Sequence, residues 1–289
     1  MTFPDTGPNA HDSGTFSIGG DMTVNRLGYG SMQLTGSRAM GEPSDPDRAK
    51  AVLRVAIELG VNLIDTADSY GPGVPERLIA EALFPYPRDL VIATKGGFVR
   101  GQRGEWITDG RPEHLREALL GSLKRLRVET IDLYQLHRID HKVPLSDQIG
   151  ALEEFRQSGL IRHIGLSEVT VEDLKTAQSQ TDIATVQNLY NLGDRRAEEL
   201  VAYTAENRIG FIPWFPLATG QLTTASGPLA SLSASTGAAP SQIAIAWLLQ
   251  HSPNILPIPG TSSPEHLREN IAAAHLKLTP RNVAELDAA

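Results

Sequence analysis

The chain has 289 residues, of which 40% are hydrophobic and 21% charged, as in ordinary globular proteins. Its 26 basic and 34 acidic residues give a net charge of −8, which argues against nucleic-acid or anionic-membrane partners. It contains no cysteine, which excludes disulfides and thiolate sites and fits a reducing, cytoplasmic location, and it has no apolar run of the roughly 18 residues that a membrane-spanning helix needs.

The first 14 residues, MTFPDTGPNAHDSG, are polar and rich in turn formers. We expect a flexible tail here, without the basic start and apolar core of a secretory signal. The next stretch, TFSIGGDMTVNRLGYG, places a Gly-Gly-Asp turn between two short runs, which predicts a β-hairpin. We expect residues 15–289 to form a single domain, because no segment is long enough for an interdomain linker. TTASGPLASLSASTGAAP is interpreted as one long loop.

After the hairpin, short apolar runs alternate with helical patterns. The helical stretches carry start and stop signals, such as the Asp and Gly that bound DPDRAKAVLRVAIELG and the Thr-x-x-Asp of TVEDLKTAQS. The apolar runs are VNRLGYG, VNLIDT, LVIATK, IDLYQLH, IRHIGLS, ATVQNLY, IGFIPWFP and NILPIPG. Eight strands alternating with eight helices predict an α/β fold, the (β/α)₈ TIM barrel. An open doubly wound sheet is the alternative, but no GxGxxG turn follows the first strand.

Polar residues stand at the ends of three successive predicted strands. Asp65 ends the second strand with Tyr70 in its loop, Lys95 ends the third and His137 ends the fourth. In such a barrel, catalytic groups lie at these carboxyl ends. An ammonium at Lys95 would lower the pKa of Tyr70 and Asp65 would hold Lys95 charged. Tyr70 could then give a proton to a carbonyl oxygen that His137 positions.

Each of these residues has an ordinary explanation when taken alone. Asp65 suits a turn or a helix cap, Lys95 suits a charged rim, and His137 suits a hydrogen-bonded core position. A Schiff-base aldolase with Lys95 as the nucleophile is a further reading, but that chemistry needs a lysine of lowered pKa, and Asp65 acts against this. The four residues together favour proton transfer to a carbonyl.

The chain resembles the aldo-keto reductases. The resemblance lies in NLIDTADSYG, VIATK, IDLYQLHRID, IRHIGLSE, VQNLYNL, WFPLATGQL and IPGTSSPEHLREN, in family order from about Asn25 to Asn270. It implies that Asp65, Tyr70, Lys95 and His137 form the catalytic tetrad of a reductase that converts aldehydes or ketones to alcohols. VNRLGYGSMQLTG, WFPLATGQL and SPNILPIPGTSSPEHLREN are most similar to the pyridoxal reductase branch.

The resemblance also implies NADP(H) as the cofactor and a small carbonyl compound as the substrate, with no metal. Substrate contacts are expected from Tyr70, His137 and Trp106. The cofactor contacts that it implies are Gly30, Ser31, Met32, Asp65, Ser167, Gln187, Trp214, Phe215, Pro216, Leu217, Thr219, Gly220, Ile258, Gly260, Thr261, Ser262, His266, Glu269 and Asn270.

Two departures from the family pattern bear on the cofactor. Glu168 stands where the family often has Asn, and Glu cannot donate an amide hydrogen. The turn after the last strand holds Gly260, Ser262 and His266 where members that use NADP often have Lys or Arg, and Arg268 is the basic residue nearby in sequence. NAD therefore stays open beside NADP.

A non-catalytic role is the alternative function. The potassium-channel β subunits resemble the same family, bind the dinucleotide and act through partners. The charge of −8 gives no positive support for such a partner surface. The sequence does not assign an oligomeric state.

Overall fold

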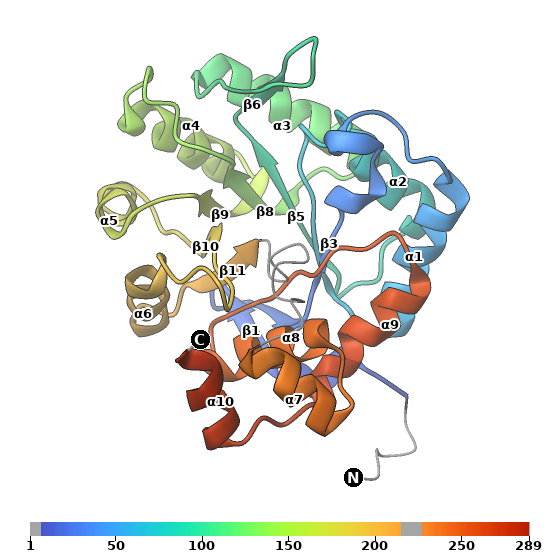
Figure 1. The fold of residues 1–289 in the computed structure, drawn as a ribbon. Coiled ribbons are helices and arrows are strands. Elements are labelled where there is room, and N and C mark those ends of the chain that lie inside the picture. Colours follow the sequence, from blue (N-terminus) through green and yellow to red (C-terminus); the bar gives the residue numbers. More distant parts are fainter. Residues whose placement is uncertain (1–6, 215–226, 289) are drawn as a thin grey trace.

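The computed structural model describes residues 7–214 and 227–288 (Figure 1). Its central feature is a parallel sheet in the order β11-β10-β9-β8-β5-β4-β3. Two antiparallel hairpins, β1–β2 and β6–β7, accompany it. The strands are β1 (Thr15–Ile18), β2 (Met22–Asn25), β3 (Tyr29–Gly30), β4 (Leu63–Asp65), β5 (Val91–Gly96), β6 (Phe98–Arg100), β7 (Trp106–Thr108), β8 (Ile131–Leu136), β9 (Ile161–Ser167), β10 (Thr185–Leu189) and β11 (Gly210–Trp214).

Helices α1 to α6 lie outside the sheet (Figure 1). The expected start signals act as caps: Asp45 accepts a hydrogen bond from the Arg48 backbone at the start of α1, and Thr170 and Asp173 form a capping box on α5. The helices are α1 (Pro46–Glu58), α2 (Val74–Leu83), α3 (Pro112–Leu126), α4 (Leu145–Gln157), α5 (Val171–Gln178), α6 (Glu198–Glu206), α7 (Pro228–Thr236), α8 (Pro240–His251), α9 (Pro264–Ala272) and α10 (Pro280–Asp287). None of the described helices is both long and apolar enough to cross a bilayer.

The segment NILPIPG closes the sheet into a barrel between β11 and β3. The Phe211 backbone exchanges hydrogen bonds of 2.8 Å with Asn254 and Leu256, and the Gly28 amide donates to the Pro257 carbonyl at 2.9 Å. The predicted eighth strand is therefore in its expected position, but it forms only an isolated parallel bridge, Phe211 to Ile255. Pro257 and Pro259 lack the N–H groups that a regular ladder requires. The predicted α/β barrel is confirmed, with this seam as its least regular part.

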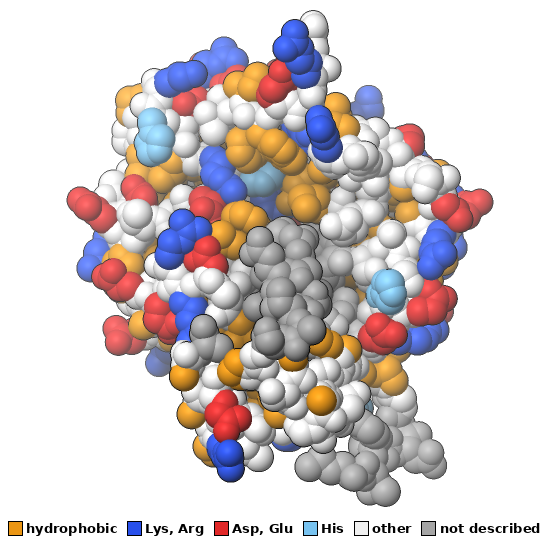
Figure 2. Space-filling model, in the orientation of Figure 1, with side chains coloured by type: hydrophobic (Ala, Val, Ile, Leu, Met, Phe, Trp, Pro, Cys, Tyr) orange, Lys and Arg blue, Asp and Glu red, His pale blue; other side chains and the backbone are white. Residues whose placement is uncertain are grey.

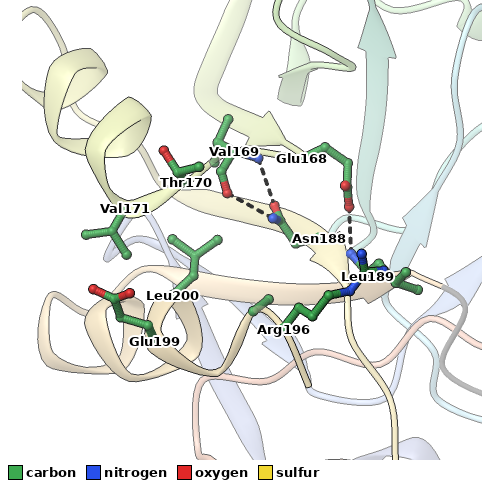
Figure 3. A pocket seen from close by; sticks show the side chains of 10 residues that line it. Glu168, Val169, Thr170, Val171, Asn188, Leu189, Arg196, Glu199 and Leu200 are labelled. Carbon is green, nitrogen blue, oxygen red and sulfur yellow. Dashed lines mark hydrogen bonds between the residues drawn. The ribbon is translucent and has the colours of Figure 1, made fainter. Parts of the chain in front are cut away.

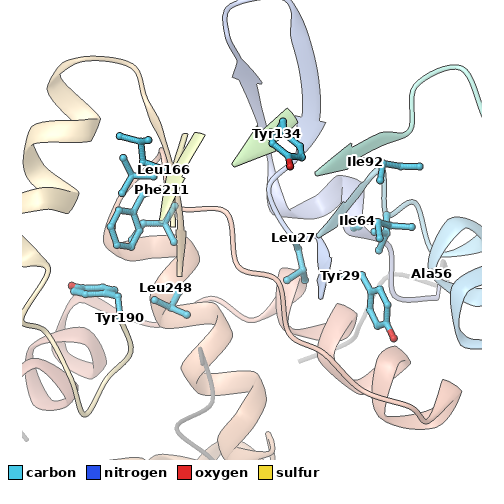
Figure 4. Close-up of a cluster of buried hydrophobic side chains, with 14 of the residues drawn as sticks. Leu27, Tyr29, Ala56, Ile64, Ile92, Tyr134, Leu166, Tyr190, Phe211 and Leu248 are labelled. Atoms are coloured by element: carbon cyan, nitrogen blue, oxygen red, sulfur yellow. The ribbon is translucent and has the colours of Figure 1, made fainter. Parts of the chain in front are cut away.

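Successive residues of each strand belong alternately to two buried clusters, one on each face of the sheet. Ile64, Ile92, Tyr134 and Phe211 belong to the large cluster between sheet and helices, part of which Figure 4 shows. Their neighbours point to the other face of the sheet, the barrel interior, as the two-residue repeat of a strand requires. This interior cluster contains Leu63, Val91, Ala93, Leu133 and Ile212 together with Ile18, Met22 and Val24 of the confirmed N-terminal hairpin. The hairpin thus closes the amino end of the barrel.

Several expectations about connecting segments are wrong. Asn9–Gly14 do not belong to a flexible tail: residues Ala10–Ser13 form a short 3₁₀ helix, and the amide of the fully buried Ala10 donates to Leu59. The apolar Ala10 side chain fixes this segment against the core. The expected long loop contains α7, and α10 follows α9 without having been predicted. The loop after Lys95 forms the β6–β7 hairpin.

Candidate active site

On each of three strands, a polar residue of the barrel interior lies two positions after an apolar one. Asp65 lies two positions after Leu63, and Lys95 lies two positions after Ala93. Gln135, two after Leu133, pairs with Lys95 in the register of β5 and β8. The same side of each strand therefore carries apolar groups toward the hairpin and polar groups toward the carboxyl end.

Asp65 and Lys95 form an ion pair inside this polar layer. Lys95 Nζ donates to Asp65 Oδ1 at 2.5 Å and to the Thr66 carbonyl at 2.8 Å, and the two side chains are 0% and 3% exposed. The other carboxylate oxygen accepts from Gln135 at 3.1 Å and from Gln187 at 2.9 Å. Burial opposes the charge on Lys95, but Asp65 and Tyr70 raise its pKa above the ordinary value. This disfavours the amine nucleophile of an aldolase.

Tyr70 lies beside this ion pair, with Lys95 Nζ 5.3 Å from its ring centroid. Burial raises the pKa of the Tyr70 phenol, and the opposing effect of Lys95 does not overcome it. The expected net lowering of this pKa is therefore wrong, because the interior removes more hydration from the phenolate than the ammonium replaces. Tyr70 stays protonated at neutral pH, as a proton donor must.

His137 faces Tyr70 across an aromatic cluster. Its ring lies 5.9 Å from that of Tyr70, 4.7 Å from Phe98 and 6.1 Å from Trp106. Burial, and then the charges of Lys95 and Arg138, keep the pKa of His137 well below its usual value. The imidazole is therefore neutral, and its Nδ1 lies 3.4 Å from Ser69 Oγ.

The β6–β7 hairpin supplies one wall of this cluster. Trp106 is 42% exposed and packs edge-on against Tyr70 at 6.2 Å. The Arg100 guanidinium lies 3.7 Å from the Trp106 ring and donates to the carbonyls of Ser69, Ala39, Arg38 and Gly104. Arg100 therefore ties the hairpin to the Tyr70 loop instead of facing an open pocket.

Ser167, Gln187 and Trp214 continue the site along β9, β10 and β11. Ser167 Oγ accepts from Arg138 at 2.9 Å. Glu168 has a φ of 56° and accepts from Trp214 Nε1 at 2.6 Å and from the Leu189 amide at 2.7 Å. The departure at Glu168 thus serves to hold the indole of Trp214.

Gly30 and Gly260 allow the backbones on the two sides of the seam to meet. A Cβ at Gly30 would lie 2.6 Å from the Ile258 carbonyl oxygen, and one at Gly260 would lie 2.7 Å from that of Gly30. The neighbouring Ser31 Oγ is buried without a hydrogen-bond partner among the described residues. Beyond the seam, Ser263 caps α9 by accepting from the His266 amide.

Arg48 of α1 was missed by the sequence analysis. Its Nε donates to the Ser262 carbonyl at 3.2 Å and its Nη2 pairs with Glu265 at 3.2 Å. It therefore brings a basic group to the strand-8 turn, although the sequence offered only Arg268 there. No local pattern could reveal it, because 214 positions separate Arg48 from Ser262.

The other predicted contacts lie along the same path or outside the described residues. Met32 is 41% exposed, whereas Asn270 on α9 is buried. Glu269 accepts from Gln242 through its carbonyl. Ile258 belongs to the interior cluster, and the Thr261 carbonyl accepts from Tyr29. Phe215, Pro216, Leu217, Thr219 and Gly220 lie outside the described residues.

A separate hollow of about 340 Å³ opens at the starts of α5 and α6 (Figure 3). Val171, Leu189 and Leu200 line it, with Glu168 at its edge. Asn188 also lines this hollow and forms hydrogen bonds with the backbone N–H and carbonyl groups of Val169. The hollow contains none of the four predicted catalytic residues. Near the middle of the face in Figure 2, basic, hydrophobic and histidine side chains gather.

Comparison with known proteins agrees with this geometry. The model of the aldo/keto reductase family matches residues 26–289. The chain belongs to the aldo/keto reductase family. It is 48% identical over 279 residues, 96% of this chain and 90% of the relative, to the uncharacterized oxidoreductase C215.11c of Schizosaccharomyces pombe. It is 44% identical over 281 residues, 95% and 98% of the two chains, to pyridoxine 4-dehydrogenase of Escherichia coli.

Solved structures carry the same fold. An aldo/keto reductase from Klebsiella pneumoniae, crystallised with NADP and acetate, superposes with a TM-score of 0.79 at 27% identity, covering 95% of this chain and 94% of the other. The expected resemblance to aldo/keto reductases, and within them to the pyridoxine 4-dehydrogenase branch, is confirmed. This aldo/keto reductase is thus a member of a family of oxidoreductases.

Proposed function

We propose that this aldo/keto reductase reduces aldehydes or ketones to alcohols with NADPH, and that Tyr70 gives the proton. The observation that carries the proposal is the buried Asp65–Lys95 ion pair beside a protonated Tyr70. The Lys95 ammonium offsets the negative charge left on Tyr70 when its proton leaves, and Asp65 keeps that ammonium in place. Neutral His137 holds the substrate oxygen by a hydrogen bond.

The residues present fit a nicotinamide dinucleotide, which supplies the hydride when bound. Ser31 has a buried hydroxyl without a hydrogen-bond partner among the described residues, and Glu168 fixes the indole of Trp214 through its N–H group. We assign the nicotinamide end to these residues with Ser167 and Gln187. The identity and fold shared with the NADP complex from Klebsiella pneumoniae support this assignment.

We assign the phosphate end to the seam and the first turn of α9. The hydroxyl groups of Thr261 and Ser262 suit an anion, because each can donate a hydrogen bond. Glu265 in this turn would repel a 2′-phosphate, and Arg48 offsets that charge. Arg48 therefore favours NADP over NAD.

Arg48→Ala tests this assignment. We expect NADPH to bind about tenfold more weakly, which is about 1.4 kcal/mol, while NADH binding changes little. Tryptophan fluorescence quenching measures both. Arg54→Ala, on the same helix, is the control. Equal losses for NADPH and NADH in Arg48→Ala would contradict the assignment.

Pyridoxal is the substrate that we propose, supported by the 44% identity to pyridoxine 4-dehydrogenase. Phe98 and Trp106 give two aromatic rings, inclined at 65° to each other, beside Tyr70 and His137 for contact with an aromatic aldehyde. NADPH absorbance, followed with pyridoxal and in parallel with 4-nitrobenzaldehyde, tests this. Faster turnover of pyridoxal supports the assignment. Equal or slower turnover keeps the reductase and rejects the vitamin B6 substrate.

Tyr70→Phe tests the proton donor. Because general acid catalysis contributes about 10²- to 10⁴-fold, we expect kcat to fall by that factor while NADPH binding stays within about twofold. Tyr203→Phe, whose hydroxyl meets Gln178 far from the ion pair, is the matched control. Normal turnover by Tyr70→Phe would overturn the mechanism. Loss of turnover and binding together would indicate misfolding, which thermal melting detects.

A further inference from the structure

Arg138, which directly follows His137 after the end of β8, carries a charge that the proposed mechanism does not use. Its Nη1 donates to the His137 carbonyl at 2.7 Å and to Ser167 Oγ at 2.9 Å. Its Nε and Nη2 make no hydrogen bond to the described residues. Because a guanidinium carries its N–H groups in a fixed planar fork, one side of the fork is held by the protein and the other is left for a further acceptor.

The guanidinium lies near both parts of the proposed site. Its Cζ is 5.7 Å from the ring centroid of Phe98, which packs against His137, and 5.8 Å from the ring centroid of Trp214. Phe98 borders the proposed position of the substrate, and Trp214 borders that of the nicotinamide. A carbonyl compound that contacts Phe98 therefore brings its other substituents close to Arg138.

The charge of Arg138 is only partly compensated by the protein. The side chain is half-buried, and burial lowers its pKa, while the charge of Glu168 opposes this effect. Glu168 accepts its hydrogen bonds from Trp214 Nε1 and from the Leu189 amide instead of from Arg138. A partly dehydrated cation without a direct acidic partner gains free energy when an anion binds to it.

The other basic side chains around the site are engaged or exposed. Lys95 is held by Asp65. Arg100 donates to four backbone carbonyls. Arg103 is exposed in the turn of the β6–β7 hairpin. Arg138 is therefore the cation best placed to meet a charged group on a substrate.

We propose that Arg138 is a specificity-determining residue that binds an anionic group of the substrate, and that carbonyl compounds bearing a carboxylate are the preferred class. The inference rests on the function proposed above and narrows its substrate range. The two oxygens of a carboxylate can accept from Nε and Nη2 together, because they match the guanidinium fork. The net charge of −8 disfavours the approach of anions in general, so selection of an anionic substrate needs a local cation.

Two pairs of aldehydes that differ in charge test the inference: 3- and 4-carboxybenzaldehyde, each beside the corresponding nitrobenzaldehyde. Carboxylate and nitro groups have the same planar shape, and only the carboxylate is charged. With saturating NADPH, the ratio of kcat/KM within a pair isolates the effect of the charge. Arg138→Met should lower this ratio about tenfold in at least one pair, through a higher KM for the carboxylated member. An unchanged ratio in both pairs would overturn the inference.

Arg138→Lys and Arg103→Met are the comparison variants. Lysine keeps the charge without the fork, so Arg138→Lys should retain part of the ratio that Arg138→Met loses. Arg103→Met removes an exposed cation of the neighbouring hairpin and should leave the ratio unchanged. A fall in Arg103→Met but not in Arg138→Met would place the anion at the hairpin and reject the assignment.

Ionic strength carries the test if Arg138→Met does not fold. In the unaltered protein, added salt screens the attraction between the guanidinium and the carboxylate. The KM of the carboxylated aldehyde should therefore rise with salt relative to the KM of its nitro partner. Parallel changes in the two KM values would count against the anion site.

Binding of unreactive amides separates this inference from the proposed function. Carboxybenzamides and nitrobenzamides of the same substitution replace the aldehyde by an amide, and calorimetry with NADPH present measures their Kd without turnover. We expect the carboxylated amide to bind about tenfold more tightly, and Arg138→Met to remove this preference. Such a preference in a protein that reduces no carbonyl would support the anion site and reject the reductase. Carbonyl reduction without the preference would keep the reductase and reject the anion site.

Discussion

The two ends of the barrel interior are built from the same strands and differ in what they do. Toward the hairpin, Leu63, Ala93 and Leu133 form an apolar layer. Two positions later on the same strands, Asp65, Lys95 and Gln135 form a polar layer joined by hydrogen bonds. The apolar layer gains free energy by leaving water, whereas the polar layer loses hydration that only its internal partners replace. Stability and chemistry thus occupy neighbouring layers of one cavity.

Breaking the ion pair should have the largest effect on stability. Lys95→Met leaves Asp65 without its cation, and we expect a loss of about 3–5 kcal/mol in the free energy of unfolding together with loss of turnover. Urea denaturation and NADPH oxidation measure the two effects.

The double variant Asp65→Asn with Lys95→Met sharpens this comparison. Neutral groups of similar size replace both charges, so most of the stability should return while turnover stays absent. If turnover returned with stability, the polar layer would serve folding and not chemistry.

Leu133→Ala tests the apolar layer. Leu133 is fully buried, so we expect a loss of about 2–5 kcal/mol from the cavity that it leaves. The kcat of the folded protein should stay within about twofold, because the substitution removes no polar contact. Leu120→Ala, at a 49% exposed position, is the control and should change stability by no more than about 0.5 kcal/mol. A large fall in kcat for Leu133→Ala would show that the layers are not separable.

His137 makes the polar layer sensitive to acid. Its pKa is held low in the folded state, whereas an unfolded histidine titrates at about 6.5. Below that pH the unfolded chain therefore binds a proton that the folded chain does not, and stability falls by up to about 1.4 kcal/mol per pH unit. His137→Gln should lose less stability than the parent between pH 6.5 and pH 5.5, and exposed His141→Gln should lose as much. Urea denaturation at both pH values measures this, and equal losses in all three proteins would contradict it.

Local patterns predicted the parts of the fold that follow strand and helix periods. The strand-end residues Asp65, Lys95 and His137 were found because parallel strands present their carboxyl ends at one edge. The same rule does not say whether burial, which raises the pKa of Tyr70, outweighs the charge of Lys95, which lowers it. The direction of the Tyr70 pKa shift was therefore predicted wrongly. That balance depends on how completely the interior excludes water.

Features that depend on contacts between distant segments were not predicted from the sequence. Arg48 reaches Ser262 only because α1 and α9 pack together. Ala10 resembled part of a tail because one small apolar residue leaves no periodic signal, yet it is buried in the core. The last strand was located but not its irregularity, since Pro257 and Pro259 change the hydrogen bonding without moving the segment.

The seam between β11 and β3 is the weakest part of the barrel wall. Elsewhere in the ring, neighbouring strands are joined by continuous ladders, but here a few amides carry the closure. Their hydrogens should exchange with deuterium sooner than those of β8 and β9. A dinucleotide held by Ser31 on one side and Thr261 on the other would span this gap and slow that exchange. In that case the bound cofactor also stabilises the closure of the barrel, and the melting temperature of the protein should rise with the nucleotide concentration.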